Sequence, residues 1–528
     1  MIDIVIKLIL MLLIVLTPVA FGSVELWAFS TMELGILLMI ILFAIQRFHF
    51  RSTNGPNVPN DPNYVNEQRI NPSTPPRIKV SRHSRGDAST HLPINTLTVF
   101  LSIFLLLILF QMLPLPAGLV RILSPRTYAL RQTLSISNFE LSALSSSGPS
   151  ALSSSSPSTL SFEPSALSFP ISFVPFVTQI NFFKWLTLIG LFAFLLYWKP
   201  FGNSYALRRQ LIMVIFVVGV WESLYGMFEF FSGHGQILNL EGENLVPSVT
   251  GTFINRNYFA GYLLMVIPLS IGYLLSREAT RRDIFMGWRH RLASLDGKTL
   301  LLGFGAIVMI VGLIFSASRM GISSLLLSFT VLSFLLRDPQ RERKFSRTSV
   351  LIFSLALLWA IWIGLDAVIS RFFTSTDDFK FRWAMWVSTF QILKDFPLFG
   401  SGLGTFTYIF PMYRSLHIQG LATHAENDLL QLAAEAGLIG VGLLLIVFFY
   451  LFWRIVSGFR SLSHGEPERY IGIGGLVGIL ALMFHSLVER NIQVPSNAFL
   501  YTILWAIVLR ISLTEKVTIK DYKINHPG

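Results

Sequence analysis

Long apolar runs recur along most of this chain and restrict it to one kind of fold. A helix needs about 20 mainly apolar residues to cross a bilayer, and lipid offers the backbone no hydrogen-bond partners. About twelve runs approach this length. The sequence therefore predicts an all-α polytopic membrane protein. The predicted spans are residues 4–21, 25–46, 96–118, 182–198, 210–231, 257–276, 299–317, 320–336, 349–369, 436–453, 470–488 and 497–512.

Composition argues against a soluble domain or a nucleic-acid partner. Hydrophobic residues make up 52% of the chain and charged residues only 13%, a balance typical of membrane proteins. The formal charge is +12, but Lys and Arg cluster between the apolar runs, as the positive-inside rule describes. Because the chain has no cysteine, its exposed loops cannot be held by disulfides.

The basic connectors set the predicted orientation. The first run contains Lys7 and lacks a small-residue cleavage site, so we interpret it as a retained helix and not a signal peptide. Basic residues are concentrated in 47–95, 277–298 and 337–347, which places these connectors in the cytoplasm. With twelve spans, both termini of this multi-pass membrane protein are then cytoplasmic.

The predicted organisation follows from the spans and connectors. The segment 119–181 contains a Ser/Pro-rich tract with an imperfect PSALS repeat, which has too few large apolar residues to fold alone. We predict two N-terminal spans (1–46), a basic disordered cytoplasmic loop (47–95), a third span (96–118), the Ser/Pro-rich periplasmic loop (119–181), spans with short loops (182–369), a large periplasmic loop with amphipathic helices (370–435), C-terminal spans (436–512) and a cytoplasmic tail (513–528).

Three arginines stand out on the predicted extracytoplasmic side. Arg256 lies between two asparagines at a helix start, Arg319 occupies a tight turn between two spans, and Arg382 lies near Trp383 and Trp386 on an amphipathic segment. A single arginine here could be an interfacial anchor or a salt-bridge partner. Three together favour a diphosphate site, because planar guanidinium groups bind phosphate oxygens in pairs.

A polar stretch, HAENDLLQLAAEAG, runs directly into an apolar span. Thr423 and Glu426 have the spacing of a capping box, which predicts a helix that begins at His424. A histidine in a first turn stays neutral and can act as a general base. Alternatively, His424 only donates to a loop carbonyl and Glu426 is only the cap. The stripe that would face a polar cavity is His424, Asp428, Gln431 and Glu435.

Three alternate glycines, Gly400, Gly402 and Gly404, follow Pro397. They resemble a phosphate loop only superficially, because no Lys-Ser/Thr pair follows them. We interpret them as a sharp turn that lets backbone segments approach closely.

These motifs together resemble the bacterial O-antigen ligase and polysaccharide polymerase superfamily over residues 180–512. The resemblance is carried by FINRNYFAGYL, SASRMGI, the spacing from Arg382 to Phe406, HAENDLLQLAAEAGLIG and HSLVERN. It implies a C-type glycosyltransferase-like architecture of membrane helices. It also implies transfer of a glycan from undecaprenyl diphosphate to an acceptor, which is lipid A core in lipopolysaccharide biosynthesis, a repeat unit in polymerases, or a protein side chain in some relatives.

The resemblance also implies roles for individual residues. Arg256, Arg319 and Arg382 would neutralise the leaving diphosphate, and His424 would take the acceptor proton. Glu426 stands where many members have a histidine, so either residue could be the base. His485 belongs to the terminal motif that forms the cavity floor. The implied cavity lining is Asn427, Asp428, Gln431, Glu435, Glu489 and Arg490.

The implied reaction is inverting and needs no metal or other cofactor. Diphosphate is a good leaving group once cations meet its developing charge. Asp377 and Asp378, in a segment expected to be an exposed loop, are the nearest approach to a metal-binding pair. A flippase or exporter would share the cationic cavity but should show repeated halves, and a scaffold subunit would need no His/Glu stripe. The sequence does not determine the identity of the acceptor.

Overall fold

The computed structural model describes residues 2–53, 94–134, 168–233, 248–279, 296–336, 376–415, 422–462 and 466–513, together with Ser354 and Leu358. The predicted span 349–369 therefore lies outside the described residues except at these two positions. Most of the basic loop, the Ser/Pro-rich tract and the C-terminal tail also lie outside them.

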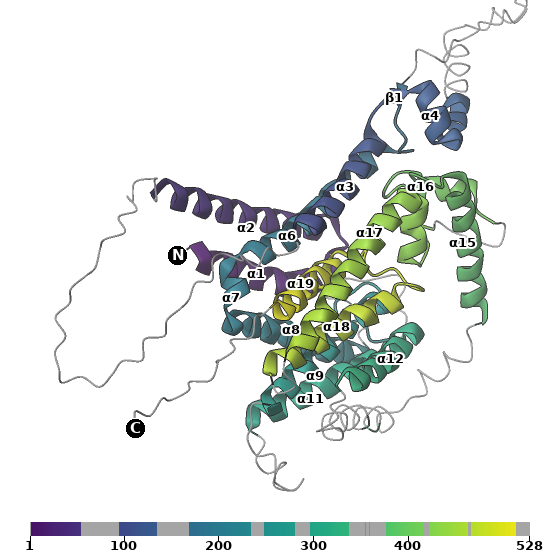
Figure 1. Cartoon of the computed structure of the whole chain (residues 1–528). Helices are drawn as coiled ribbons and strands as arrows, with labels where there is room; N and C mark the ends of the chain where they lie inside the picture. Colours follow the sequence, from purple (N-terminus) through teal and green to yellow (C-terminus); the bar gives the residue numbers. More distant parts are fainter. Residues whose placement is uncertain are drawn as a thin grey trace, which may run out of the picture.

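The described residues form a bundle of long helices (Figure 1). Eight of these helices are long and apolar enough to cross a membrane, and α3 and α12 contribute shorter apolar helices. The fold is thus that of an all-α polytopic membrane protein. The long helices are α1 (Ile2–Val19), α2 (Leu26–Thr53), α3 (Ile94–Met112), α6 (Pro175–Tyr197), α8 (Tyr205–Ser232), α9 (Arg256–Ala279), α11 (Gly297–Phe315), α12 (Arg319–Leu335), α17 (Asp428–Ser461), α18 (Pro467–His485) and α19 (Pro495–Ser512).

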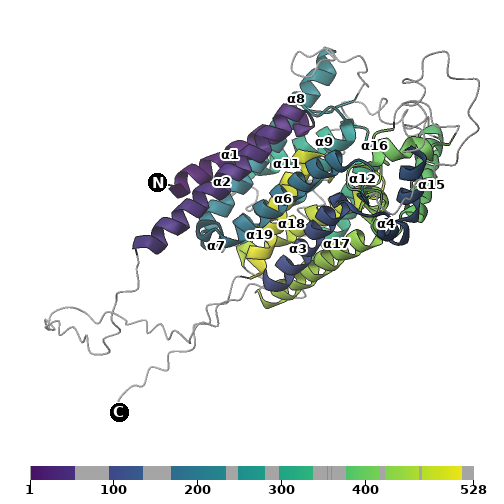
Figure 2. The same ribbon diagram turned by 90° about the horizontal axis from the view of Figure 1, so that it is seen from above.

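Short elements gather mainly at one end of this bundle. Strands β1 (Leu115–Pro116) and β2 (Ser168–Phe169) pair antiparallel, with Leu115 opposite Phe169. Figures 1 and 2 both place α4, α15 and α16 together beyond the end of α3. Helix α15 (Thr376–Asp395) is a 20-residue helix that packs at this end. The remaining short elements are η1 (Phe21–Ser23), α4 (Ala117–Leu123), α7 (Lys199–Asn203), α16 (Phe406–Ile409) and η3 (Phe410–Met412).

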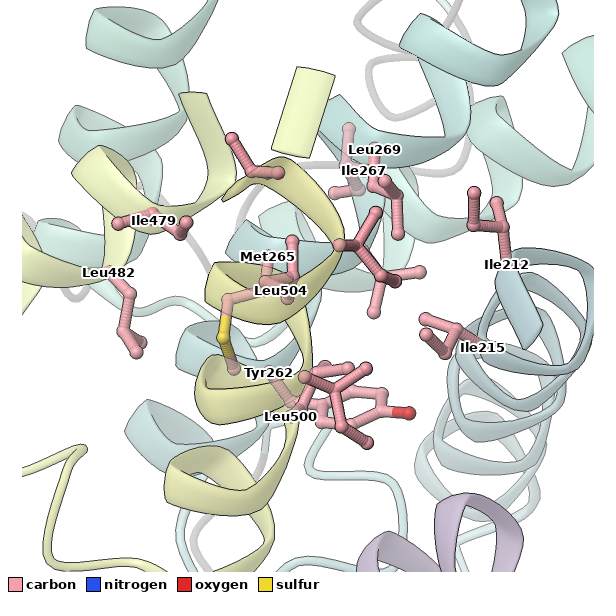
Figure 3. Packing of buried hydrophobic residues seen from close by; sticks show 14 of the residues in the cluster. Ile212, Ile215, Tyr262, Met265, Ile267, Leu269, Ile479, Leu482, Leu500 and Leu504 are labelled. Atoms are coloured by element: carbon pink, nitrogen blue, oxygen red, sulfur yellow. The ribbon is translucent and has the colours of Figure 1, made fainter. Parts of the chain in front are cut away.

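Helix α9 is the centre of the bundle, and its most apolar window is entirely buried. It packs closely on α18, because Gly272 and Gly474 face each other: a Cβ on Gly272 would lie 3.0 Å from the Gly474 Cα. Small residues permit such approach between helices in lipid. Figure 3 shows Tyr262 and Met265 of α9 packed among apolar side chains of α8, α18 and α19.

Helix α17 is broken at Gly437, which has φ 70° and ψ 178°. The loop that follows α15 fills the break. The N–H groups of Leu438 and Ile439 donate to the carbonyls of Pro397 and Leu398 at 2.9 and 3.3 Å. Backbone groups that leave a helix within a membrane need such partners, because lipid supplies none.

The same loop returns along the first part of α17. The N–H of Gly402 donates to the Glu435 carbonyl at 3.0 Å, and the Gln111 side chain of α3 donates to the carbonyls of Phe399 and Glu435 at 2.6 and 2.9 Å. Gly400 has φ 73°, and a Cβ there would lie 2.2 Å from the Glu435 carbonyl. The alternate glycines therefore form the expected close turn.

The break in α17 gives a direct test of this packing. Gly437→Ala should destabilise the protein, because strained backbone of this kind costs about 1–3 kcal/mol without glycine and the new Cβ would lie 2.1 Å from the Leu398 carbonyl oxygen. Gly442→Ala, in the same helix and with no atom within 4 Å of its Cβ, should be neutral or stabilising by up to about 1 kcal/mol.

The readout is the thermal unfolding midpoint of each purified variant in detergent. Equal midpoints for the two alanine variants would contradict a required break at Gly437.

Candidate functional site

The ends of four helices meet at the end of the bundle where α9 and α17 begin. The N–H of Asp428, the first residue of α17, donates to the carbonyl of Ser486, just after α18 ends, at 3.0 Å. Asn497, near the start of α19, donates to the carbonyl of Tyr258 in α9 at 3.1 Å. The segments around 256–258, 424–435 and 485–497 therefore form one site.

The predicted helix start at His424 is wrong. Helix α17 begins at Asp428, and the Asn427 side chain caps it by accepting the Leu430 N–H at 2.9 Å. Glu426 has φ 50°, so the chain is not helical there. Asparagine is a stronger N-cap than threonine, and it displaces the start by four positions relative to the capping box that Thr423 suggested.

His424 is kept neutral by its surroundings and not by a helix dipole. Burial lowers the pKa of its imidazole well below the ordinary range, and the nearby charges of Arg490 and Lys184 lower it further. The Arg490 guanidinium also contacts the His424 Nδ1. Since a guanidinium can only donate hydrogen bonds, Nδ1 is the acceptor and the ring proton lies on Nε2. In this arrangement His424 offers an N–H group and not a free basic nitrogen.

Arg490 is itself held by α9. Its Nε donates to the Tyr258 hydroxyl, and its guanidinium carbon lies 4.8 Å from the centre of the Tyr258 ring, a cation–π contact. Tyr258 is two residues beyond Arg256, so this contact links His424 to the helix start that carries the first predicted arginine.

Arg382 and Glu489 form an ion pair at the same site. Arg382 Nη2 lies 2.5 Å from a Glu489 carboxylate oxygen, and its Nη1 donates to the Val488 carbonyl at 2.5 Å. Burial raises the pKa of Glu489, whereas Arg382 and a hydrogen bond from Asn257 oppose the shift. Because Asn257 follows Arg256 directly, the pair lies against the start of α9.

Arg256 and Arg319 occupy neighbouring helix starts. The N-cap Ser318 accepts the Gly321 N–H at 3.2 Å, and a Cβ on Gly321 would lie 2.9 Å from the Ala260 Cβ of α9. Arg256 Nη1 is buried and, among the residues the structure describes, has no hydrogen-bond partner. It is therefore a cation with capacity for an anionic ligand.

The four arginines Arg256, Arg319, Arg382 and Arg490 are called the arginine cluster below. A cavity of about 380 Å³ opens beside this cluster between α3, α6, α17 and α19. Its polar lining comes from the first turns of α17 and from α6, and its apolar lining from residues farther along the same helices, such as Val441, Leu451 and Phe192. A cavity that is polar at one end and apolar along its length suits an amphiphilic ligand. The polar lining includes Asn181, Lys184, His424, Asp428, Gln431 and Glu435.

The stripe on α17 mainly fixes loops. Asp428 Oδ2 accepts the N–H groups of Asn491 and Ile492 at 2.7 and 2.9 Å. Glu435 accepts those of Gly404 and Phe406 at 2.9 and 3.1 Å. Gln431 Nε2 also donates to Glu435 Oε1 at 3.0 Å. The carboxylates of Asp428 and Glu435 therefore already accept hydrogen bonds from N–H donors.

Several predicted site residues lie outside the described lining of the cavity. Among these, Glu426 is half-buried, and it has no hydrogen bond to any other residue that the structure describes. The others outside the lining are Arg256, Arg319, Arg382, Asn427, His485, Glu489 and Arg490. The arginine cluster and the cavity are thus adjoining regions that meet at His424.

Lys184 is a site residue that the sequence interpretation missed. It lies on α6, and its Nζ donates to the Gln493 carbonyl at 2.7 Å. It faces Asp428 and Glu435 and is the one Lys or Arg in the described cavity lining. The signal was present, because a lysine inside an apolar span is a functional candidate by default.

Within the described residues, no group of three His, Cys, Asp or Glu side chains could hold a metal ion. Asp377 and Asp378 lie in the first turn of α15, so the expectation of a loop at these residues is wrong.

Comparison with known families bears on the resemblance noted from the motifs. Residues 304–445 match the family model described as O-antigen ligase. This segment of the chain is therefore similar to an O-antigen ligase domain. This confirms the resemblance to the O-antigen ligase-like superfamily and supports a membrane protein of glycosyl-transferring type. No curated protein matches the sequence.

The matched residues include part of the site just described. Arg319, Arg382 and the segment from His424 to Glu435 fall within them, whereas Arg256 and Arg490 lie on either side. The matched residues therefore contribute α12, α15 and the start of α17, and the rest of the chain supplies the start of α9 and the segment between α18 and α19.

The Arg490 contact predicts how His424 titrates. Arg490→Gln should raise the pKa of His424, because the arginine charge is one cause of its lowered value; burial should still keep it below the ordinary value of about 6.5. The measurement is the pH dependence of exchange at the imidazole C2 position, resolved by peptide mass spectrometry. Arg121→Gln, an exposed substitution on α4, is the control. An unchanged midpoint in Arg490→Gln would contradict the contact.

Proposed function

We propose that the protein transfers a glycan from undecaprenyl diphosphate to an acceptor hydroxyl at the periplasmic face of the inner membrane, with both termini in the cytoplasm and a C-type arrangement of spans. The observation that carries the proposal is the apolar cavity whose polar end adjoins the arginine-bearing helix starts. The apolar lining suits the part of a polyprenyl chain next to the headgroup, and the diphosphate would then lie near the arginines.

The arginines would act on the diphosphate in different ways. Arg256 has a buried N–H group without a protein partner among the described residues, so it can bind a phosphate oxygen directly. Arg382 is paired with Glu489, and a diphosphate would share or displace that carboxylate. Arg319 starts α12 beside the start of α9, where the helix N-terminus adds partial positive charge.

The His424–Arg490 contact favours Glu426 as the general base. Because Arg490 occupies His424 Nδ1, the neutral ring would donate from Nε2 and orient a phosphate or sugar oxygen. The Glu426 carboxylate has no described hydrogen-bond partner, and its φ of 50° is the kind of local strain found at functional sites.

The proposed step is a direct displacement with inversion. Glu426 takes the proton of the acceptor hydroxyl as that oxygen bonds to the anomeric carbon. The bond from this carbon to the diphosphate oxygen breaks, and undecaprenyl diphosphate leaves with the electron pair. The guanidinium groups meet the negative charge that develops on the leaving group, which is the main way such a site would lower the barrier.

Two substitutions separate the roles of Glu426 and His424. Glu426→Gln should lower kcat about 10²- to 10⁴-fold, the usual contribution of a general base, and leave binding of the lipid-linked donor intact. His424→Gln, which keeps a side-chain N–H donor, should lose less. Wild-type activity should also persist as pH falls through about 6.5, because the lowered pKa keeps His424 neutral.

The assay is glycan transfer by purified enzyme to a defined acceptor, with Glu25→Gln, an exposed carboxylate, as the control. A larger loss in His424→Gln than in Glu426→Gln would reverse the assignment. A protein that moved the lipid-linked glycan across vesicles without forming a glycosidic product would be a transporter instead.

The phosphate-binding role of the arginines has its own test. Arg256→Lys and Arg382→Lys should each lower kcat/KM for the lipid-linked donor at least about tenfold, because lysine keeps the charge but cannot bind two oxygens in a plane. Arg121→Lys on α4 is the matched control. Wild-type kinetics in both site variants would make these arginines structural anchors.

A further inference from the structure

A second cavity, of about 300 Å³, lies at the opposite end of the bundle. Helix α9 begins at Arg256 in the candidate site, and its last turns, with Tyr273 and Arg277, line this cavity. The other walls are the starts of α8, α11 and α18. The proposed reaction uses none of these residues.

The two arginines that line this cavity differ in their partners. Arg277 is neutralised by Asp296, whose carboxylate lies 2.6 Å from its Nη2. Arg209 instead donates from Nε to the Tyr273 hydroxyl at 2.6 Å, with its guanidinium 5.9 Å from the ring centre. Among the residues the structure describes, no carboxylate forms an ion pair with Arg209. One of its five N–H donors is therefore committed to Tyr273, and the described contacts leave the other donors available to a ligand.

Two helices also begin at this cavity, α11 at Gly297 and α18 at Pro467. The carbonyls of their N-cap residues, Asp296 and Glu466, accept the N–H groups of Thr299 and Arg469. The partial positive charge at a helix N-terminus favours an anion. The phenols of Tyr205 and Tyr273 supply further polar groups at the rim.

The position of the cavity selects the kind of anion. Helices α8, α9, α11 and α18 are all candidate membrane spans, and each has an end here, so the cavity lies at the depth of lipid headgroups. Basic pockets between such helix ends suit phospholipid phosphates, and tyrosines are common at this depth. We propose that this cavity binds the phosphate of an anionic phospholipid headgroup, with Arg209 as its main ligand.

The test is lipid binding by the purified full-length protein, and it needs no transfer activity. Native mass spectrometry with phosphatidylglycerol should show retained lipid, and phosphatidylcholine should be retained far less. Arg209→Gln should weaken phosphatidylglycerol binding at least tenfold, and Tyr273→Phe, which frees the Arg209 Nε, should weaken it several-fold. Lys298→Gln removes an exposed charge near the start of α11 and should bind as wild type does.

Three outcomes would overturn the proposal. Equal retention of phosphatidylglycerol by wild type and Arg209→Gln would remove Arg209 as a ligand, and equal weakening in Lys298→Gln would indicate general charge attraction. Thermal stabilisation by inorganic phosphate as strong as that by phosphatidylglycerol would assign the cavity to a soluble phosphate and not to a lipid. Arg209 is exposed, so its substitution should leave the unfolding midpoint in detergent unchanged.

Discussion

The break in α17 at Gly437 is the constraint on which the arrangement of the site depends. A helix that opens inside a membrane exposes carbonyl and N–H groups that lipid cannot satisfy. The 397–402 loop and Gln111 supply those partners. In doing so they fix the position of the first part of α17 relative to its long apolar part. The first part carries Asp428, Gln431 and Glu435. The same polar stripe then holds the loops on either side, so the break and the site form one hydrogen-bonded unit.

Most of the charges in this unit are already paired. Arg490 contacts His424 and Tyr258, Arg382 pairs with Glu489, and Asp428 and Glu435 accept backbone N–H groups. Within the described contacts, Arg256 keeps an unpartnered buried N–H group, and Glu426 is a carboxylate without a hydrogen-bond partner. A displacement reaction on a diphosphate donor requires these two capacities, a cation for the leaving group and a base for the acceptor.

The sequence was most informative where one local property decides the structure. Apolar length located the spans that the structure describes, because burial in lipid leaves few alternatives to a helix. Positive φ angles at Gly400, Gly402 and Gly404 agree with the close turn expected there. The start of α17 was misplaced because two capping signals compete within five residues, and only the folded chain shows that Asn427 bonds to Leu430.

The contacts that give the site its chemistry join distant parts of the chain, and a single sequence does not contain them. His424 and Arg490 are separated by 66 residues, and Gln111 and Glu435 by 324. Lys184 was missed for a different reason: it lies inside a run that had been counted only for its apolar length.

His424 is the point at which the two halves of the site meet. It lines the cavity together with Lys184, and it contacts Arg490, which lies outside that lining. At the polar end of the cavity the positive charge of Lys184 is opposed by Asp428 and Glu435, so this end does not favour a diphosphate. The helix starts that carry Arg256 and Arg319 do favour one. In the proposed complex the lipid chain occupies the cavity and its diphosphate turns past His424 toward Arg256. The glycan is then placed beside Glu426, two residues from His424, where an acceptor can approach the face opposite the leaving group.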